Sequence, residues 1–196
     1  MREPIRVTAG FILVALWFAA VNGWGTLGLI LLFSLVHELG HYLILNWYRA
    51  EIRGFQINAF GAVLEADTSN LSYGEEFLAV AAGPAANFLC ASLLGLGKRQ
   101  EWDVLIGCNI VLCIFNLLPM RLLDGGRMVY LLAAWLVGPQ FGEQCLRWMG
   151  VVSAALISMV LLGVICSTKG SFWLIPPITG LLLTICREVR ENKHFL

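Results

Sequence analysis

The sequence has little charge and no excess of either sign. Of its 196 residues, 13% are charged and 59% are hydrophobic, the net charge is zero, and the mean hydropathy is +0.78. Soluble domains average about 25% charged and about 45–50% apolar residues. A nucleic-acid-binding protein would normally carry a basic patch, so we expect no nucleic-acid partner. The composition instead predicts a chain whose surroundings are the lipid bilayer.

The sequence also lacks a C-x-x-C pair, although it contains six cysteines. Most of them lie inside apolar runs, which favours small buried side chains over a zinc knuckle or a disulfide framework. Arg2 and Arg6 precede an apolar run, as in a signal peptide, but no clear cleavage site follows. We therefore expect this run to be retained as the first membrane span.

Six apolar runs predict an all-α polytopic membrane protein with about six transmembrane helices. The runs are Val7–Trp24, Gly25–Trp47, Phe77–Leu96, Val104–Leu118, Met149–Cys166 and Phe172–Cys186. With the N-terminus in the cytoplasm, ten Arg and Lys residues fall on the cytoplasmic side and three outside. This bias predicts a multi-pass protein of the cell membrane with both termini in the cytoplasm.

Two segments do not fit simple spans. Ile52–Glu65 alternates apolar and polar residues around Phe55, Ile57 and Ala59, which predicts a short β-hairpin between the second and third spans. Arg127–Val137 is apolar but short, as in a re-entrant or interfacial helix. No long linker or repeat is visible, so we expect residues 1–196 to form one domain, with no appended PDZ or CBS domain.

The strongest chemical signal is the sequence His37-Glu38-Leu39-Gly40-His41 inside an apolar run. Residues four apart share one face of a helix, so both imidazoles can reach one metal ion. Glu38 lies one step round the helix, where it can accept a proton from water. Ionisable groups at mid-bilayer depth are costly, which favours a functional role over a polar cluster that only ties helices together.

Zinc catalysis usually requires a third protein ligand. His194 lies in the charged tail, whereas Asp124 lies in the run NLLPMRLLDGG. Pro119 predicts the end or a kink of the preceding helix, and Gly125 and Gly126 predict a tight bend beside the carboxylate. Asp124 is therefore the better candidate for the third ligand.

These motifs resemble the site-2 protease family of intramembrane metalloproteases. The likeness rests on His37-Glu38-x-x-His41, Asn116-x-x-Pro119, Leu123-Asp124-Gly125 and the run AGPAAN that ends at Asn87. The sequence is most similar to the sporulation branch, whose members often carry a C-terminal CBS domain. The resemblance implies Zn2+ bound by His37, His41 and Asp124, with Glu38 as the general base.

Further residues are candidates for binding substrate. Asn116 can hydrogen-bond the scissile peptide or the developing oxyanion, or it can tie helices together, and Asn87 has the same two interpretations. Phe55, Ile57 and Phe60 mark the hairpin, which can capture an unwound substrate as an added strand.

The predicted function is cleavage of a membrane-associated protein, for example a sigma-factor precursor in sporulation, subject to inhibitory membrane proteins. Two alternatives stay open. The first is a protease of the same type that acts on an anti-sigma factor or signal-peptide remnants. The second is a membrane metal-binding protein or transporter without hydrolysis, although such a protein has no special need for Glu38 between two metal-binding histidines.

Overall fold

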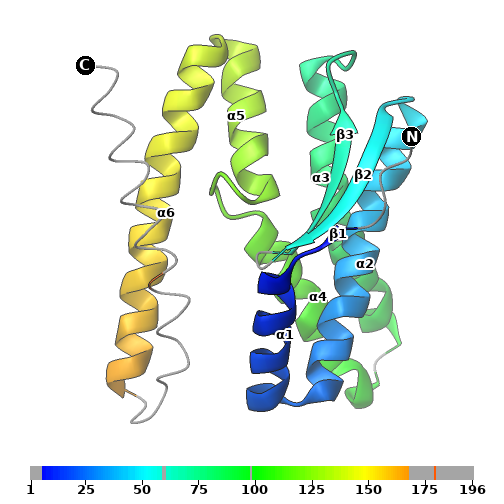
Figure 1. Ribbon diagram of the computed structural model, residues 1–196, viewed down its shortest axis with the longest axis vertical. Helices are drawn as coiled ribbons and strands as arrows, with labels where there is room; N and C mark the ends of the chain where they lie inside the picture. The colour runs from blue at the N-terminus through cyan, green and yellow to red at the C-terminus, as the bar shows by residue number, and fades with distance from the viewer. Residues whose placement is uncertain (1–5, 59–60, 98, 168–178, 180–196) are drawn as a thin grey trace. The chain divides into compact units, whose positions relative to one another are not determined.

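The computed structural model describes residues 6–58, 61–97, 99–167 and 179, in two compact units, residues 1–117 and 118–196 (Figure 1). The first unit contains, in chain order, β1 (Arg6–Val7), α1 (Ala9–Asn22), α2 (Trp24–Trp47), β2 (Glu51–Asn58), β3 (Gly61–Asp67), α3 (Tyr73–Leu96), a 3-10 turn (Gln100–Trp102) and α4 (Asp103–Asn116). The second unit contains α5 (Asp124–Leu136) and α6 (Pro139–Ser167). The predicted mainly helical chain with a short hairpin is confirmed.

Three helices in the described part of the chain, α2, α3 and α6, are long and apolar enough to cross a membrane, with 24, 24 and 29 residues. They coincide with the second, third and fifth predicted spans. Their large apolar side chains largely face outward, and Leu35 on α2 and Phe88 on α3 are 58% and 65% exposed. Soluble proteins rarely expose continuous apolar surface of this kind, so these helices need lipid around them. The chain is a membrane protein.

The helices α1 and α4 are shorter than the spans predicted for them. Each has 14 residues, which is about 21 Å of helix against a hydrocarbon core of about 30 Å. The predicted first span was wrong at both ends, because Val7 belongs to β1 and Gly23, with a φ of 86°, separates α1 from α2. Thr8 sets the start of α1 by accepting a hydrogen bond from the Phe11 amide. The sixth predicted span, Phe172–Cys186, lies outside the described residues.

The predicted hairpin is present as the antiparallel strands β2 and β3, in which Phe55 pairs with Leu64. A third strand, β1, pairs in parallel with β2 through Val7 and Ile57, so the strand order is β1-β2-β3. In Figure 1, β1 leads directly into α1, and the hairpin runs alongside α2. No sequence pattern indicated β1, because two residues are too few to show an alternation of apolar and polar residues.

Small residues bring α2 and α3 close together. A Cβ atom on Gly40 of α2 would lie 2.9 Å from the Ala82 carbonyl carbon and 3.0 Å from the Ala86 Cβ on α3. Close backbone approach of this kind lets helices associate in lipid, because the hydrophobic effect does not drive two apolar helices together there. The buried face of α2 holds Phe33, His37 and Gly40. The histidine motif therefore lies on the face of α2 that is turned towards α3.

The second unit begins with the loop that follows α4. The predicted effect of Pro119 is confirmed, because α4 ends at Asn116. The predicted bend at Gly125 and Gly126 was wrong: both lie in the first turn of α5, and neither has a positive φ. Gly126 is needed for close packing, since a Cβ there would overlap the Met120 carbonyl group.

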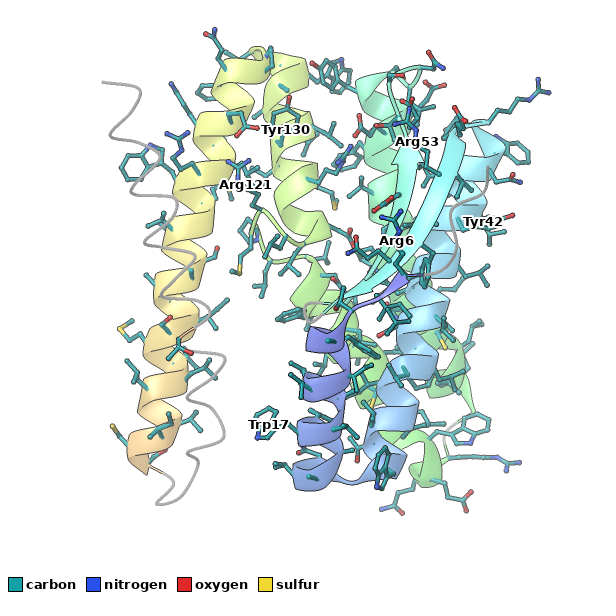
Figure 2. All side chains as sticks on the ribbon, viewed as in Figure 1. Arg6, Trp17, Tyr42, Arg53, Arg121 and Tyr130 are labelled. Atoms are coloured by element: carbon teal, nitrogen blue, oxygen red, sulfur yellow. The ribbon has the colours of Figure 1, made fainter. Side chains whose placement is uncertain are left out.

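The predicted short helix at Arg127–Val137 is present as α5 and starts three residues earlier. In the same unit Arg121, labelled in Figure 2, donates a hydrogen bond to the Glu143 carboxylate on α6 at 2.8 Å. This hydrogen bond holds the loop at the start of the second unit against α6.

Candidate metal centre

His37 and His41 lie one turn apart on α2, and their Nε2 atoms are 3.1 Å apart. The rings stand edge to face, with an angle of 81° between their planes. His37 is buried and His41 is half-buried. Zinc binds histidine nitrogen at about 2.0–2.1 Å, so a tetrahedral ion separates two such nitrogens by about 3.3 Å. The pair therefore fits one zinc ion, as the four-residue spacing predicted.

The other nitrogen of each ring is held by an oxygen atom. His37 Nδ1 lies 2.8 Å from Asn87 Oδ1, and His41 Nδ1 lies 2.8 Å from the Ala79 carbonyl oxygen. An amide or carbonyl oxygen can only accept, so both Nδ1 atoms carry hydrogen and donate it. In the neutral rings both Nε2 atoms then present lone pairs to one another. A cation next to both relieves this repulsion, and oxygen-held Nδ1 atoms are typical of metal-bound histidine.

Gly83 on α3 leaves space beside both imidazoles. A Cβ atom there would lie 2.5 Å from His41 Cε1 and 2.7 Å from His37 Nε2. Real Cβ atoms essentially never come closer than 3.0 Å to such neighbours. The absence of a side chain at residue 83 therefore lets both imidazoles lie directly against the backbone of α3.

The other predicted active-site residues are placed on helices by their local sequence. Glu38 is half-buried on α2, between the two histidines in sequence. Asp124 is half-buried and is the first residue of α5 in the second unit. A helix N-terminus favours a carboxylate, because unpaired amide groups and the helix dipole point towards it. The assignment of Asp124 as the third ligand remains a prediction.

The predicted substrate-binding residues have different surroundings. Asn87 is fully buried on α3 and contacts His37, while Asn116 is half-buried at the end of α4 and donates to the Leu112 carbonyl at 3.0 Å. Phe55 and Ile57 lie on β2, half-buried. Phe60 lies outside the described residues. Direct contact of any of them with substrate remains a prediction.

Sequence reasoning missed Asn109 on α4, which is fully buried and hydrogen-bonded to Asn87. A signal was available, because Asn109 is the only strongly polar residue within the apolar run Val104–Phe115. Polar side chains in such runs are costly and are kept for a partner. The Ala79 carbonyl, in contrast, left no trace in the sequence, since any residue has a carbonyl oxygen.

Comparison with known proteins finds relatives among zinc metalloproteases and a related fold. The model of Peptidase family M50 matches residues 91–160. A Synechocystis protein provisionally named zinc metalloprotease sll0528 is 27% identical over 167 residues, which is 77% of this chain and 44% of the relative. Stage IV sporulation protein FB of Bacillus subtilis is 29% identical over 130 residues, which is 60% of this chain and 45% of the relative. The chain thus spans less than half the length of these two relatives.

Among solved structures, the site-2 protease from Methanocaldococcus jannaschii has a similar fold, with a TM-score of 0.65 and 20% identity. The match covers 97% of this chain and 92% of that protein. Part of the chain thus resembles Peptidase family M50, and its fold resembles that of a site-2 protease.

Proposed function

We propose that this chain is an intramembrane zinc metalloprotease that hydrolyses a peptide bond of a membrane-associated protein. The observation that carries the proposal is the histidine pair on α2. Its Nε2 atoms are 3.1 Å apart, and both Nδ1 atoms are held by oxygen acceptors. This is the arrangement that second-sphere oxygen atoms impose on zinc-binding histidines.

In this proposal Asp124 is the third zinc ligand. The residue types of His37, His41 and Asp124 could together hold a metal ion, and three protein ligands leave one position open, as in catalytic zinc sites. The start of α5 gives the carboxylate a fixed backbone anchor. When bound, zinc supplies a Lewis acid that polarises a carbonyl and makes water more acidic.

Glu38 is the proton carrier. Its position directly after His37 places it one step round α2 from the ligand face. It takes a proton from the attacking water and returns it to the leaving amine. A protein that only binds or transports metal has no such need for a carboxylate, and the acidic residue therefore favours hydrolysis.

A substrate has to be unwound before its peptide bond can be attacked, and the sheet offers a place for the unwound strand. Because β1 already pairs with β2 at Gln56 and Ile57, the free long edge within the described sheet belongs to β3. An extended substrate added there would gain backbone hydrogen bonds. We infer that Phe55 and Ile57 act by supporting this edge, and that Asn116 and Asn87 lie near the reacting bond.

The likeness to other proteases supports a choice of substrate class, and the bias of Arg and Lys residues supports a membrane arrangement. We propose that residues 1–196 act as a single catalytic domain with several membrane passes and both termini in the cytoplasm, on the cationic side of the chain. Stage IV sporulation protein FB is a relative, so the first substrate to test is a membrane-associated sigma-factor precursor. Anti-sigma factors and signal-peptide remnants are the next substrates to test, and membrane proteins that inhibit cleavage are candidate partners.

The proposal is tested by co-expressing the chain with each membrane-associated sigma-factor precursor, and comparing wild type with Glu38→Gln. We expect cleavage by wild type only, with at least a hundredfold loss in the variant, since general-base catalysis contributes about 10²–10⁴-fold. Zinc content is measured in parallel and should be equal in both proteins. Cleavage by Glu38→Gln at the wild-type rate would refute the role of Glu38. Bound zinc without cleavage of any precursor, anti-sigma factor or signal-peptide remnant would favour a non-hydrolytic metal-binding protein.

A further inference from the structure

Two asparagines are completely buried between helices of the first unit. Asn87 on α3 and Asn109 on α4 both have 0% exposure. A buried amide is costly unless its polar atoms are hydrogen-bonded, and within a bilayer no water replaces a lost partner. A pair of such residues in apolar helices therefore needs a reason beyond packing.

Both amides form a single chain of hydrogen bonds that ends at a proposed zinc ligand. Asn109 Nδ2 donates to the Leu105 carbonyl at 2.9 Å, and Asn109 Oδ1 accepts from Asn87 Nδ2 at 3.0 Å. Asn87 Nδ2 also donates to the Phe33 carbonyl at 3.0 Å, and Asn87 Oδ1 accepts from His37 Nδ1 at 2.8 Å. These hydrogen bonds thus connect α4, α3 and α2.

The direction of every bond in this chain is fixed by backbone carbonyl groups. The Leu105 carbonyl can only accept, so it orients the amide nitrogen of Asn109 towards itself and the amide oxygen towards Asn87. That oxygen and the Phe33 carbonyl both require the amide nitrogen of Asn87. The oxygen of Asn87 is then left for His37, whose Nδ1 must carry the hydrogen.

We propose that Asn109 is a positioning residue of the metal centre, which acts through Asn87 to hold His37 in the tautomer whose Nε2 carries no hydrogen and can bind zinc. This inference rests on the proposed function. Without Asn109, one of the two acceptors that orient Asn87 is lost. A flipped Asn87 would present its nitrogen to His37 Nδ1 and favour hydrogen on Nε2, the atom needed by the metal. With Asn109 present, the same flip would place the Asn87 oxygen next to Asn109 Oδ1 and the Phe33 carbonyl oxygen, and the three would repel one another.

The test compares Asn109→Leu with Asn109→Asp and with Cys113→Ala in the full-length protein in detergent. Leucine has a similar volume but offers no acceptor, whereas aspartate keeps an oxygen for Asn87, and burial favours its neutral form, which can also donate to Leu105. Cys113 is buried one turn further along α4, so its truncation controls for packing.

Zinc affinity, measured by competition with a chelator, is the first readout. We expect Asn109→Leu to bind zinc about tenfold more weakly, at the lower end of the 10–100-fold effects of such outer residues. Asn109→Asp and Cys113→Ala should stay within about threefold of wild type. Adding Asn109→Leu to Asn87→Leu should cause no further loss, because the path to His37 is already broken.

Nitrogen-15 NMR of the imidazoles, in a chain with three histidines, is the second readout. After zinc removal it should show hydrogen on Nδ1 of His37 in wild type and a shift towards Nε2 in Asn109→Leu. Wild-type affinity and an unchanged tautomer in Asn109→Leu would overturn the proposal, and so would an equal loss in Cys113→Ala. Should Asn109→Leu not fold, an Asn109→Asp variant with weak zinc binding would overturn it as well. A wild-type protein without zinc affinity would instead refute the proposed function.

Discussion

Replacement of Gly83 by alanine should damage the metal centre more than any other single-methyl change on α3. The added Cβ would lie 2.7 Å from His37 Nε2, whereas ordinary contacts begin at 3.4 Å, so the atoms must separate by 0.7 Å (3.4 minus 2.7). His41 Cε1, at 2.5 Å, would have to move as well. Both imidazoles are held through Nδ1 by Asn87 and Ala79, which prevents a simple rotation.

Overpacking of this kind costs about 1–3 kcal/mol, and every 1.4 kcal/mol corresponds to about a tenfold change in affinity. We therefore expect Gly83→Ala to bind zinc about 5- to 150-fold more weakly and to lose at least as much cleavage activity. Chelator competition measures the first quantity, and cleavage of a membrane-associated precursor measures the second.

Gly95→Ala is the matched control, because it lies on the same helix and a Cβ there has no neighbour within 4 Å among the described residues. This control should bind zinc normally and gain a little stability, since alanine favours helix over glycine by about 0.5–1 kcal/mol. Wild-type zinc affinity in Gly83→Ala would show that the imidazoles can move freely. The two Nε2 atoms would then not be a preformed metal site.

Two further predictions concern the fold around the site. Gly40→Ala should force α2 away from α3 and lower stability by about 1–3 kcal/mol. Gly28→Ala should not, because a Cβ there has no neighbour within 4 Å in the described part of the chain. Thermal unfolding in detergent measures both variants, and equal unfolding temperatures would contradict the close contact between α2 and α3. Hydrogen bonds from the amide and hydroxyl of Ser69, and the nearby Arg53, hold the pKa of the Asp67 carboxyl below its ordinary value of 3.8. Because this pKa is lowered in the folded protein, the carboxylate stabilises the fold above pH 3.8, and the effect is lost as the pH falls through the folded value. The difference in unfolding temperature between wild type and Asp67→Asn should therefore shrink below about pH 3.8. A difference that stays constant as the pH falls would contradict a stabilising role of the Asp67 carboxylate.

The parts of the fold that the sequence predicted well are those with a long or periodic pattern. The runs around α2 and α3 and the alternation around Phe55 each repeat over many residues, and all three elements are present. The pair β1 and β2 was not predictable, because it depends on a two-residue strand that meets a distant partner. The glycine pair after Asp124 suggested a bend, and only the packing against Met120 explains why it is helical.

In the candidate site, too, the features set by local spacing were predictable and the contacts between distant residues were not. The spacing of His37 and His41 was enough to predict that they face one point, because helix geometry alone determines it. What holds the rings was not predictable, since the partners are a carbonyl oxygen and an amide on another helix. Asn87 was predicted as a substrate contact or a packing residue, and the structure adds its bond to His37.

The buried polar residues of the first unit connect fold and chemistry. Four buried polar side chains occur in the described part of the chain, and three of them, His37, Asn87 and Asn109, form one hydrogen-bonded series. Apolar packing between lipid-exposed helices specifies their relative register weakly, since lipid competes equally well for the same surface. Each amide of this series is satisfied only in one register of α2, α3 and α4. The interactions that orient the proposed zinc ligand are therefore also those that select how the three helices pack, and weakening either should weaken both.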